Sequence, residues 1–213
     1  MQKVAITIAR QYGSGGSVVG RMLAEQLGID YYDKELLSMV CGERGIDEKE
    51  LEKADEKARP SLLFGLAKNV YDSEKSPRDL DEAVTSEKLF HYQAKLIKAV
   101  ASEESCVIIG RCADFVLKDF PNVLRVFIHA PEDKRVERAW SIRSDLHLKD
   151  VSKYMEKVDR RRGSYYKYYT GQIWTDARNY DLCIDSSKLG YQGCVDTIVH
   201  QMELCLGWDS CKE

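Results

Sequence analysis

The sequence predicts an α/β fold, a three-layer sandwich in which a sheet of about five parallel strands lies between helices. Three observations lead to this prediction. Short apolar runs rich in β-branched residues recur along the 213 residues, helix-compatible segments separate them, and an apolar content of 44% suffices for one sizeable core. Strands joined through helices are parallel, with right-handed crossovers. We therefore expect a single domain over residues 1–213.

The elements can be placed in chain order from the periodicity of their apolar residues. The run "VAITIA" at 4–9 is the first strand, and residues 18–27 form a helix with its apolar side chains on one face. Gly28 suits a left-handed C-cap, and a short strand at 29–32 follows it. Three further strands are expected at 106–110, 123–130 and 180–186, and three further helices at 86–101, 131–142 and 191–206.

Two regions interrupt this alternation and are interpreted as insertions at the edge of the sheet. Residues 34–84 are dominated by charged, helix-compatible sequence such as "IDEKELEKADEKARP", which indicates a small helical subdomain. Residues 145–177 contain "KVDRRRGSYYKYYTGQIW", in which basic and aromatic residues are dense.

Composition restricts the class of protein. No apolar run approaches the roughly 20 residues of a membrane span, and the apolar part of the N-terminus is too short for a signal peptide, so a cytoplasmic location and no membrane partner are expected. The seven cysteines form no C-x-x-C pair, which favours reduced thiols over a disulfide framework or a zinc site. The formal net charge of −3 argues against a generally basic surface for nucleic acid.

The stretch "ITIARQYGSGGSVVGRMLAEQLG" joins a strand, a glycine-rich turn and a helix, as a phosphate-binding loop requires. Against the pattern G-x-x-x-x-G-K-[ST], Arg10 takes the first glycine position, Gly15 the second, Gly16 the lysine position and Ser17 that of the Mg²⁺-binding hydroxyl. The candidate nucleotide-binding residues are Arg10, Gly13, Ser14, Gly15, Gly16 and Ser17. On these residues alone, a glycine-rich turn without specific chemistry is an equal alternative.

Over nearly its whole length the chain resembles the cytidylate kinase-like branch of the nucleoside monophosphate kinases. The phosphate loop followed at once by "IDYYDKELL", the segment "VIIGRCADFVL" and the segment "DRRRGSYYKYYTGQIWTDARNYDLCID" carry the resemblance in this order and spacing. The resemblance extends to the absence of lysine from the phosphate loop. The resemblance implies a P-loop kinase fold in which 34–84 binds the acceptor and 145–177 is a lid.

The resemblance also implies roles for three residues at the carboxyl ends of strands. Asp33 is placed to touch the sugar or base of the acceptor nucleotide, and an N-cap of the helix after it is the alternative. Arg111 is placed to clamp the acceptor phosphate, with Gly110 allowing close approach, and pairing with Asp114 is the alternative. Asp114 is a further candidate contact for the acceptor base or sugar.

Phosphoryl transfer needs positive charge around the transferring group, and arginines of the expected lid can supply it. The candidate catalytic residues are Arg160, Arg161, Arg162 and, on the helix after the fourth strand, Arg138. On a helix, three consecutive arginines point in different directions, so we expect two of the three to face the phosphates and one to face solvent. A solvated charge cluster and an RNA contact are the alternatives.

The function implied is ATP- and Mg²⁺-dependent phosphoryl transfer to a nucleoside monophosphate, with CMP as the first candidate and no nucleic acid partner. Two alternatives stay open. The missing lysine favours a nucleotide-binding regulatory protein with little turnover, and the long insertion allows a kinase for another small phosphate acceptor. The sequence leaves the oligomeric state open.

Overall fold

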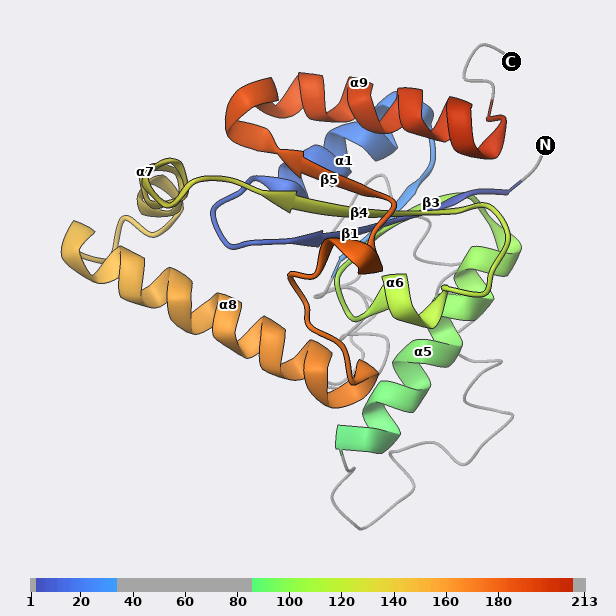
Figure 1. The fold of residues 1–213 in the computed structure, drawn as a ribbon, viewed down its shortest axis with the longest axis horizontal. Helices are drawn as coiled ribbons and strands as arrows, with labels where there is room; N and C mark the ends of the chain where they lie inside the picture. Colours follow the sequence, from blue (N-terminus) through green and yellow to red (C-terminus); the bar gives the residue numbers. More distant parts are fainter. Residues whose placement is uncertain (1–2, 34–85, 209–213) are drawn as a thin grey trace, which may run out of the picture.

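The computed structural model describes residues 3–33 and 86–208, and it contains the predicted parallel sheet between helices (Figure 1). The strand order is β2-β3-β1-β4-β5, and every neighbouring pair is parallel. In the register of the central strands, Ile6 pairs with Val107 on one side and Leu124 on the other. The strands are β1 (Ala5–Arg10), β2 (Asp30–Tyr32), β3 (Cys106–Ile109), β4 (Val123–His129) and β5 (Leu182–Asp185).

Helices cover both faces of the sheet, which confirms the predicted fold class. In Figure 1, α1 and α9 lie on one face, α5 and α6 on the other, and α8 runs obliquely on the side of α5. Apolar side chains of the sheet are buried against both layers, as their near-continuous apolar sequence requires. The helices are α1 (Gly16–Leu27), α5 (Ser86–Glu103), α6 (Ala113–Val116), α7 (Glu132–Ile142), α8 (Leu148–Thr170) and α9 (Ser186–Leu206), with a 3₁₀ turn at Ala177–Asn179.

Two glycines set helix boundaries. Gly28 has φ 63° and its amide bonds to carbonyls of the last turn of α1, so the predicted C-cap is confirmed. Gly190 has φ 68° and ψ −179°, and it divides α9 into a short first part and a longer second part. The longer part corresponds to the helix expected at 191–206. The first part was not expected, and Ser186, expected at the end of the last strand, is instead the first residue of α9.

The two expected insertions have different outcomes. Residues 34–84 lie outside the described residues. Within 145–177, the structure has one long helix, α8, whose Val151 and Met155 pack against Ala139 of α7. Three apolar side chains therefore fix the first half of α8 to the body of the protein, and the arginines lie in its second half.

Among the described residues, no helix has both the length and the apolar character to cross a membrane. The five cysteines of this part of the chain are free thiols, and Cys106, Cys112 and Cys194 are buried. These observations agree with the prediction of reduced cysteines.

Candidate functional site

The carboxyl ends of β1 and β3 bring together the two turns singled out in the sequence. β1 ends at Arg10 and leads into the glycine loop 11–15, and β3 ends at Ile109 and leads into Gly110 and Arg111. β1 and β3 are neighbouring parallel strands, so both turns lie at the same edge of the sheet. In open α/β sheets, ligands bind outside this carboxyl edge.

The glycine loop has the backbone of an anion-binding loop. Gly13 and Gly15 have φ angles of 77° and 80°, which favour glycine. A Cβ at Gly13 would also lie 2.5 Å from the carbonyl oxygen of Arg135 in α7. Gly15 is the N-cap of α1 and has no side-chain hydrogen bond that caps the helix, so the first-turn amides point to where an anion can bind. Ser17 lies in this first turn with its side chain exposed.

Arg10 passes directly beside the position where other phosphate loops have lysine. An ideal Cβ on Gly16 would lie 2.5 Å from Cβ and 3.0 Å from Cγ of Arg10. The side chain then extends to the next strand, where a Cβ on Gly110 would lie 2.5 Å from Nη1 of Arg10. The two glycines thus make room for one arginine that spans from the phosphate loop to the turn after β3.

The guanidinium of Arg10 is buried among other cations. Burial, followed by the charge of Arg162, lowers the pKa of Arg10 to about 9, and Asp33 beside it acts in the opposite direction. The Nε of Arg10 is buried and has no hydrogen-bond partner among the described residues. A bound anion would offset both the charge repulsion and the missing hydrogen bond.

Four arginines line a pocket of about 280 Å³ at this edge. Arg10 and Arg111 come from the ends of β1 and β3, and Arg161 and Arg162 come from α8. The remaining wall contains three aromatic side chains and one carboxylate. Its other residues are Ala9, Ile109, Gly110, Cys112, Asp114, Tyr165, Tyr166 and Trp174.

The turn that presents Arg111 has an unusual backbone. Gly110, Arg111 and Cys112 have successive φ angles of 72°, 56° and 55°. A side-chain-bearing residue in this left-handed region costs on the order of 1–3 kcal/mol, and such residues cluster at ligand sites. Burial raises the pKa of Tyr165 to about 12. The charge of Arg111 and a hydrogen bond between Arg111 and Tyr165 act in the opposite direction on this pKa. Arg111 is therefore held against the pocket wall.

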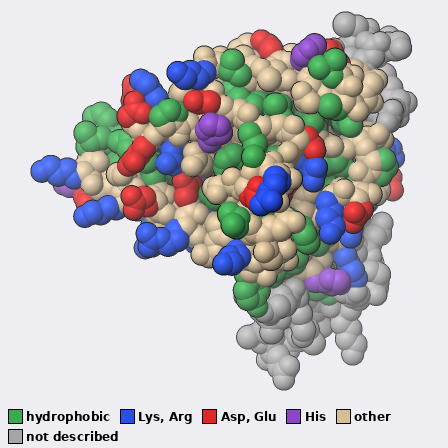
Figure 2. Space-filling view, in the orientation of Figure 1, with side chains coloured by type: hydrophobic (Ala, Val, Ile, Leu, Met, Phe, Trp, Pro, Cys, Tyr) green, Lys and Arg blue, Asp and Glu red, His purple; other side chains and the backbone are tan. Residues whose placement is uncertain are grey.

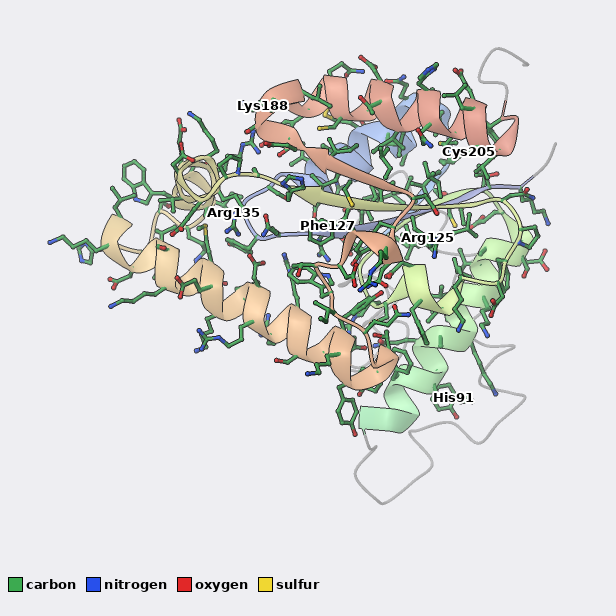
Figure 3. The ribbon with its side chains drawn as sticks, viewed as in Figure 1. His91, Arg125, Phe127, Arg135, Lys188 and Cys205 are labelled. Carbon is green, nitrogen blue, oxygen red and sulfur yellow. The ribbon has the colours of Figure 1, made fainter. Side chains whose placement is uncertain are left out.

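Asp114 is the buried carboxylate of the pocket. It is 4% exposed, and its Oδ2 accepts a hydrogen bond of 2.6 Å from the hydroxyl of Tyr166. Burial raises the pKa of Asp114, and the hydrogen bond from Tyr166 partly offsets that effect. Tyr166 also belongs to an aromatic cluster that includes Phe127 of β4, which Figure 3 places under the sheet on the side facing α8.

The three consecutive arginines of α8 differ in their surroundings. Arg161 and Arg162 line the pocket, and Arg160 does not. Arg162 is half-buried, whereas Arg160 and Arg161 are both exposed. Nη1 of Arg162 donates a hydrogen bond of 2.9 Å to the carbonyl oxygen of Arg10. In Figure 2, basic and acidic side chains are interspersed over the outer side of α8.

Arg138 lies behind the phosphate loop. Its Nη1 donates hydrogen bonds to the carbonyl oxygen of Ser14, at 3.1 Å, and to Oγ of Ser186, at 2.9 Å. Ser14 is fully buried and its hydroxyl bonds to the carbonyl oxygen of Gln11. Arg138 thus joins the loop to the start of α9. It does not line the arginine pocket.

Two further polar residues were not singled out from the sequence. Asp159 of α8 and Arg135 of α7 form an ion pair of 2.6 Å, and both hydrogen bond to the backbone of Tyr12. Figure 3 shows Arg135 where α7 faces the loop after β1. Asp159 directly precedes the three arginines, and this adjacency was the available sequence signal.

Asp33 follows β2, and its alternative role as an N-cap depends on residues outside the described part.

Known proteins are similar to this chain in sequence and in architecture. Two proteins named cytidylate kinase, from Methanosarcina acetivorans and Methanosarcina barkeri, are 29% and 28% identical to the chain over 207 and 206 residues, each covering 95% of this chain and 98% of the relative. A crystal structure of a protein from Eubacterium ventriosum has a TM-score of 0.70 at 28% identity and covers 94% of this chain and 99% of that one.

A gluconokinase from Sinorhizobium meliloti, with a TM-score of 0.52 at 15% identity and 97% and 96% coverage, has the same P-loop kinase fold. The pattern of the cytidylate kinase-like family matches residues 5–188. That range begins in β1 and ends in the first part of α9, so it includes the loop, the pocket and α8. The chain belongs to the cytidylate kinase-like family.

Proposed function

We propose that the protein transfers the γ-phosphoryl group of ATP to a nucleoside monophosphate, with Mg²⁺ as cofactor and CMP as the first candidate acceptor. The observation that carries this proposal is the convergence of four arginines on one pocket beside the glycine loop. The names of the two Methanosarcina relatives support the choice of CMP.

The glycine loop is the proposed site for the phosphates of ATP. The left-handed glycines at 13 and 15 and the uncapped start of α1 give a cradle of backbone amides. A side chain at Gly13 would collide with the backbone of Arg135, and one at Gly15 would collide with the ring of Tyr191. Mg²⁺ is commonly held by substrate phosphates, water and one or two protein oxygens, and the exposed hydroxyl of Ser17 suits that role. Bound Mg²⁺ would neutralise charge on the phosphates.

The arginine pocket is the proposed site for the acceptor. Arg111 is placed to clamp its phosphate, and Arg10 reaches the same pocket from the phosphate loop. Asp114 and the aromatic side chains around it suit a base or sugar, which needs both stacking surfaces and hydrogen bonds. Asp33 lies near Arg10 and remains a proposed acceptor contact.

Arg161 and Arg162 are the proposed lid arginines that stabilise charge on the transferring group. Arg10 supplies the cation that the loop lysine provides in other P-loop kinases, because it occupies the space beside Gly16. We assign Arg138 to positioning of the loop, since it bonds to the carbonyl oxygen of Ser14. Arg160 is exposed and serves as the comparison residue.

An ADP-release assay with ATP, Mg²⁺ and a panel of nucleoside monophosphates tests the proposal. CMP is expected to give the highest kcat/KM, and the phosphorylated product is identified by mass. Turnover only with another small acceptor would replace the acceptor and keep the transfer chemistry. Binding of Mg·ATP without any turnover would favour the regulatory alternative, which the lysine-free loop motivates.

A further inference from the structure

The backbone amide and the backbone carbonyl of Tyr12 both form hydrogen bonds with side chains of α7 and α8. The amide of Tyr12 donates a hydrogen bond of 2.8 Å to Oδ1 of Asp159 in α8. The carbonyl oxygen of Tyr12 accepts one of 3.3 Å from Nη1 of Arg135 in α7. Tyr12 lies directly before Gly13, so these bonds fix the residue at which the phosphate loop begins to turn.

The two side chains also hold one another. Nη1 of Arg135 lies 2.6 Å from Oδ2 of Asp159, and their side chains are only 14% and 17% exposed. At this burial, the loss of one partner leaves the other with an uncompensated charge, so the pair acts as a unit. The carbonyl oxygen of Arg135 also packs where a Cβ of Gly13 would project.

The same turn of α8 contacts the residue before the loop. Arg162, one helical turn after Asp159, donates to the carbonyl oxygen of Arg10, and its guanidinium lies 5.7 Å from the centre of the Tyr12 ring. Nη1 of Arg162 is also 3.6 Å from Oδ1 of Asp159. Asp159 therefore touches both the loop backbone and the arginine that lines the pocket.

We propose that Asp159 is a positioning residue for phosphoryl transfer, which rests on the function proposed above. Its carboxylate ties α8 to the amide of Tyr12, so that the shape of the phosphate loop and the placement of Arg162 are set by one contact. A hydrogen bond from a backbone amide to a carboxylate is charge-assisted and strong, which suits this role. Asp159 itself does not touch a reacting group.

The first measurement follows the contact itself, in the protein without ligand. Hydrogen exchange by NMR should show a protected Tyr12 amide, and Asp159→Asn should speed its exchange at least about tenfold, the factor for loss of a hydrogen bond to a charged group. Glu156→Gln is the matched control, because it removes an exposed carboxylate from the same helix. Amides of β3 should exchange alike in all variants, which shows that the fold is intact.

The second measurement follows the consequence for the nucleotide. Titration calorimetry should show that Asp159→Asn weakens Mg·ATP at least about tenfold, while the affinity for the acceptor changes less than about threefold. In turnover, kcat should fall as well, because Arg162 loses its orientation. Arg135→Gln should produce a smaller change in the same direction, and it carries the test if Asp159→Asn does not fold.

The outcomes separate this proposal from the function on which it rests. Unchanged Tyr12 exchange in the variants overturns the positioning role whether or not the protein binds ATP. Equal loss of affinity for ATP and acceptor also overturns it, because that result indicates general damage. If the unmodified protein binds no ATP, the proposed function fails, and the exchange data alone still decide whether Asp159 holds the loop.

Discussion

The side chain of Arg10 occupies the space that a side chain at Gly16 would need, since an ideal Cβ there would lie 2.5 Å from Cβ of Arg10. In the pattern G-x-x-x-x-G-K-[ST], the first position is glycine and the later one is lysine, whereas this chain has arginine first and glycine later. The two departures therefore compensate for one another. Arginine at the end of β1 requires glycine at the start of α1.

This compensation predicts that the pair can be exchanged together better than singly. Gly16→Lys should lower kcat/KM because the new side chain collides with Arg10, and Arg10→Gly should lower it because the pocket loses a cation. The double variant Arg10→Gly/Gly16→Lys restores the lysine-bearing pattern and should lose less than the two single effects combined, with a coupling of at least about 1 kcal/mol. Steady-state kinetics of the four proteins measure this coupling.

Thermal unfolding of the same four proteins provides the control. Overpacking costs typically about 1–3 kcal/mol, so Gly16→Lys alone should also lower Tm, and the double variant should recover part of that loss. Purely additive effects on both kcat/KM and Tm would contradict the compensation between Arg10 and Gly16.

Most of the fold could be predicted from the sequence, whereas the contacts of the site could be predicted only in part. The parallel strands and the layers follow from the alternation of apolar runs and helices, and the C-cap at Gly28 follows from glycine chemistry. The strand order does not follow from that alternation. The path of the Arg10 side chain could not be predicted, because the match to the pattern G-x-x-x-x-G-K-[ST] gives the position of Arg10 but not the direction of its side chain. That Gly110 also makes room for Arg10 is visible only in the structure.

Asp159 and Arg135 were not identified for a related reason. Charged residues on amphipathic helices are usually solvated, and 24 residues separate these two in the chain. Their meeting depends on how α7 packs against α8, through Ala139 and Met155, which periodicity alone does not specify. Similarly, helical geometry predicts that three consecutive arginines point in different directions, but only the packing of α8 decides that Arg161 and Arg162 line the pocket and Arg160 does not.

Arg111→Ala should separate the two substrates. Because Arg111 lines the pocket and is not part of the glycine loop, the variant should weaken the acceptor by about 1.5–3 kcal/mol and change ATP affinity little. Separate titrations with CMP and with Mg·ATP measure the difference. An equal loss for both ligands would indicate damage to the strained turn instead of loss of a phosphate contact.

The arginines of α8 should differ in kind. Arg161→Ala and Arg162→Ala should lower kcat, and at least one should do so by on the order of 10³-fold, the lower end of what an arginine finger contributes. Arg160→Ala should stay close to the unmodified protein, because that side chain lies outside the pocket. Saturating kinetics at a fixed acceptor concentration test this order. A loss in Arg160→Ala as large as in the other two would contradict it.

Asp114 should make stability depend on pH in a direction fixed by its burial. Its pKa is raised in the folded protein, so the folded state binds its proton more tightly than the unfolded state, where the ordinary value of 3.8 applies. The stability it contributes is therefore fully present below that ordinary value and is lost as pH rises through the folded-state pKa. Asp114→Asn removes this titration and still offers an oxygen to the Tyr166 hydroxyl.

Thermal unfolding of both proteins should then give Tm curves that diverge with pH. Near pH 4, about the ordinary pKa of an aspartate, the two values should be similar, and above the folded-state pKa the Asp114→Asn variant should be the more stable. If Asp114 contacts the acceptor, the same variant should bind CMP more weakly while it gains stability. A gain in stability coupled to a loss in binding distinguishes a site residue from a structural one. Tm curves that run parallel, or CMP affinity that does not change, would remove Asp114 from the proposed site.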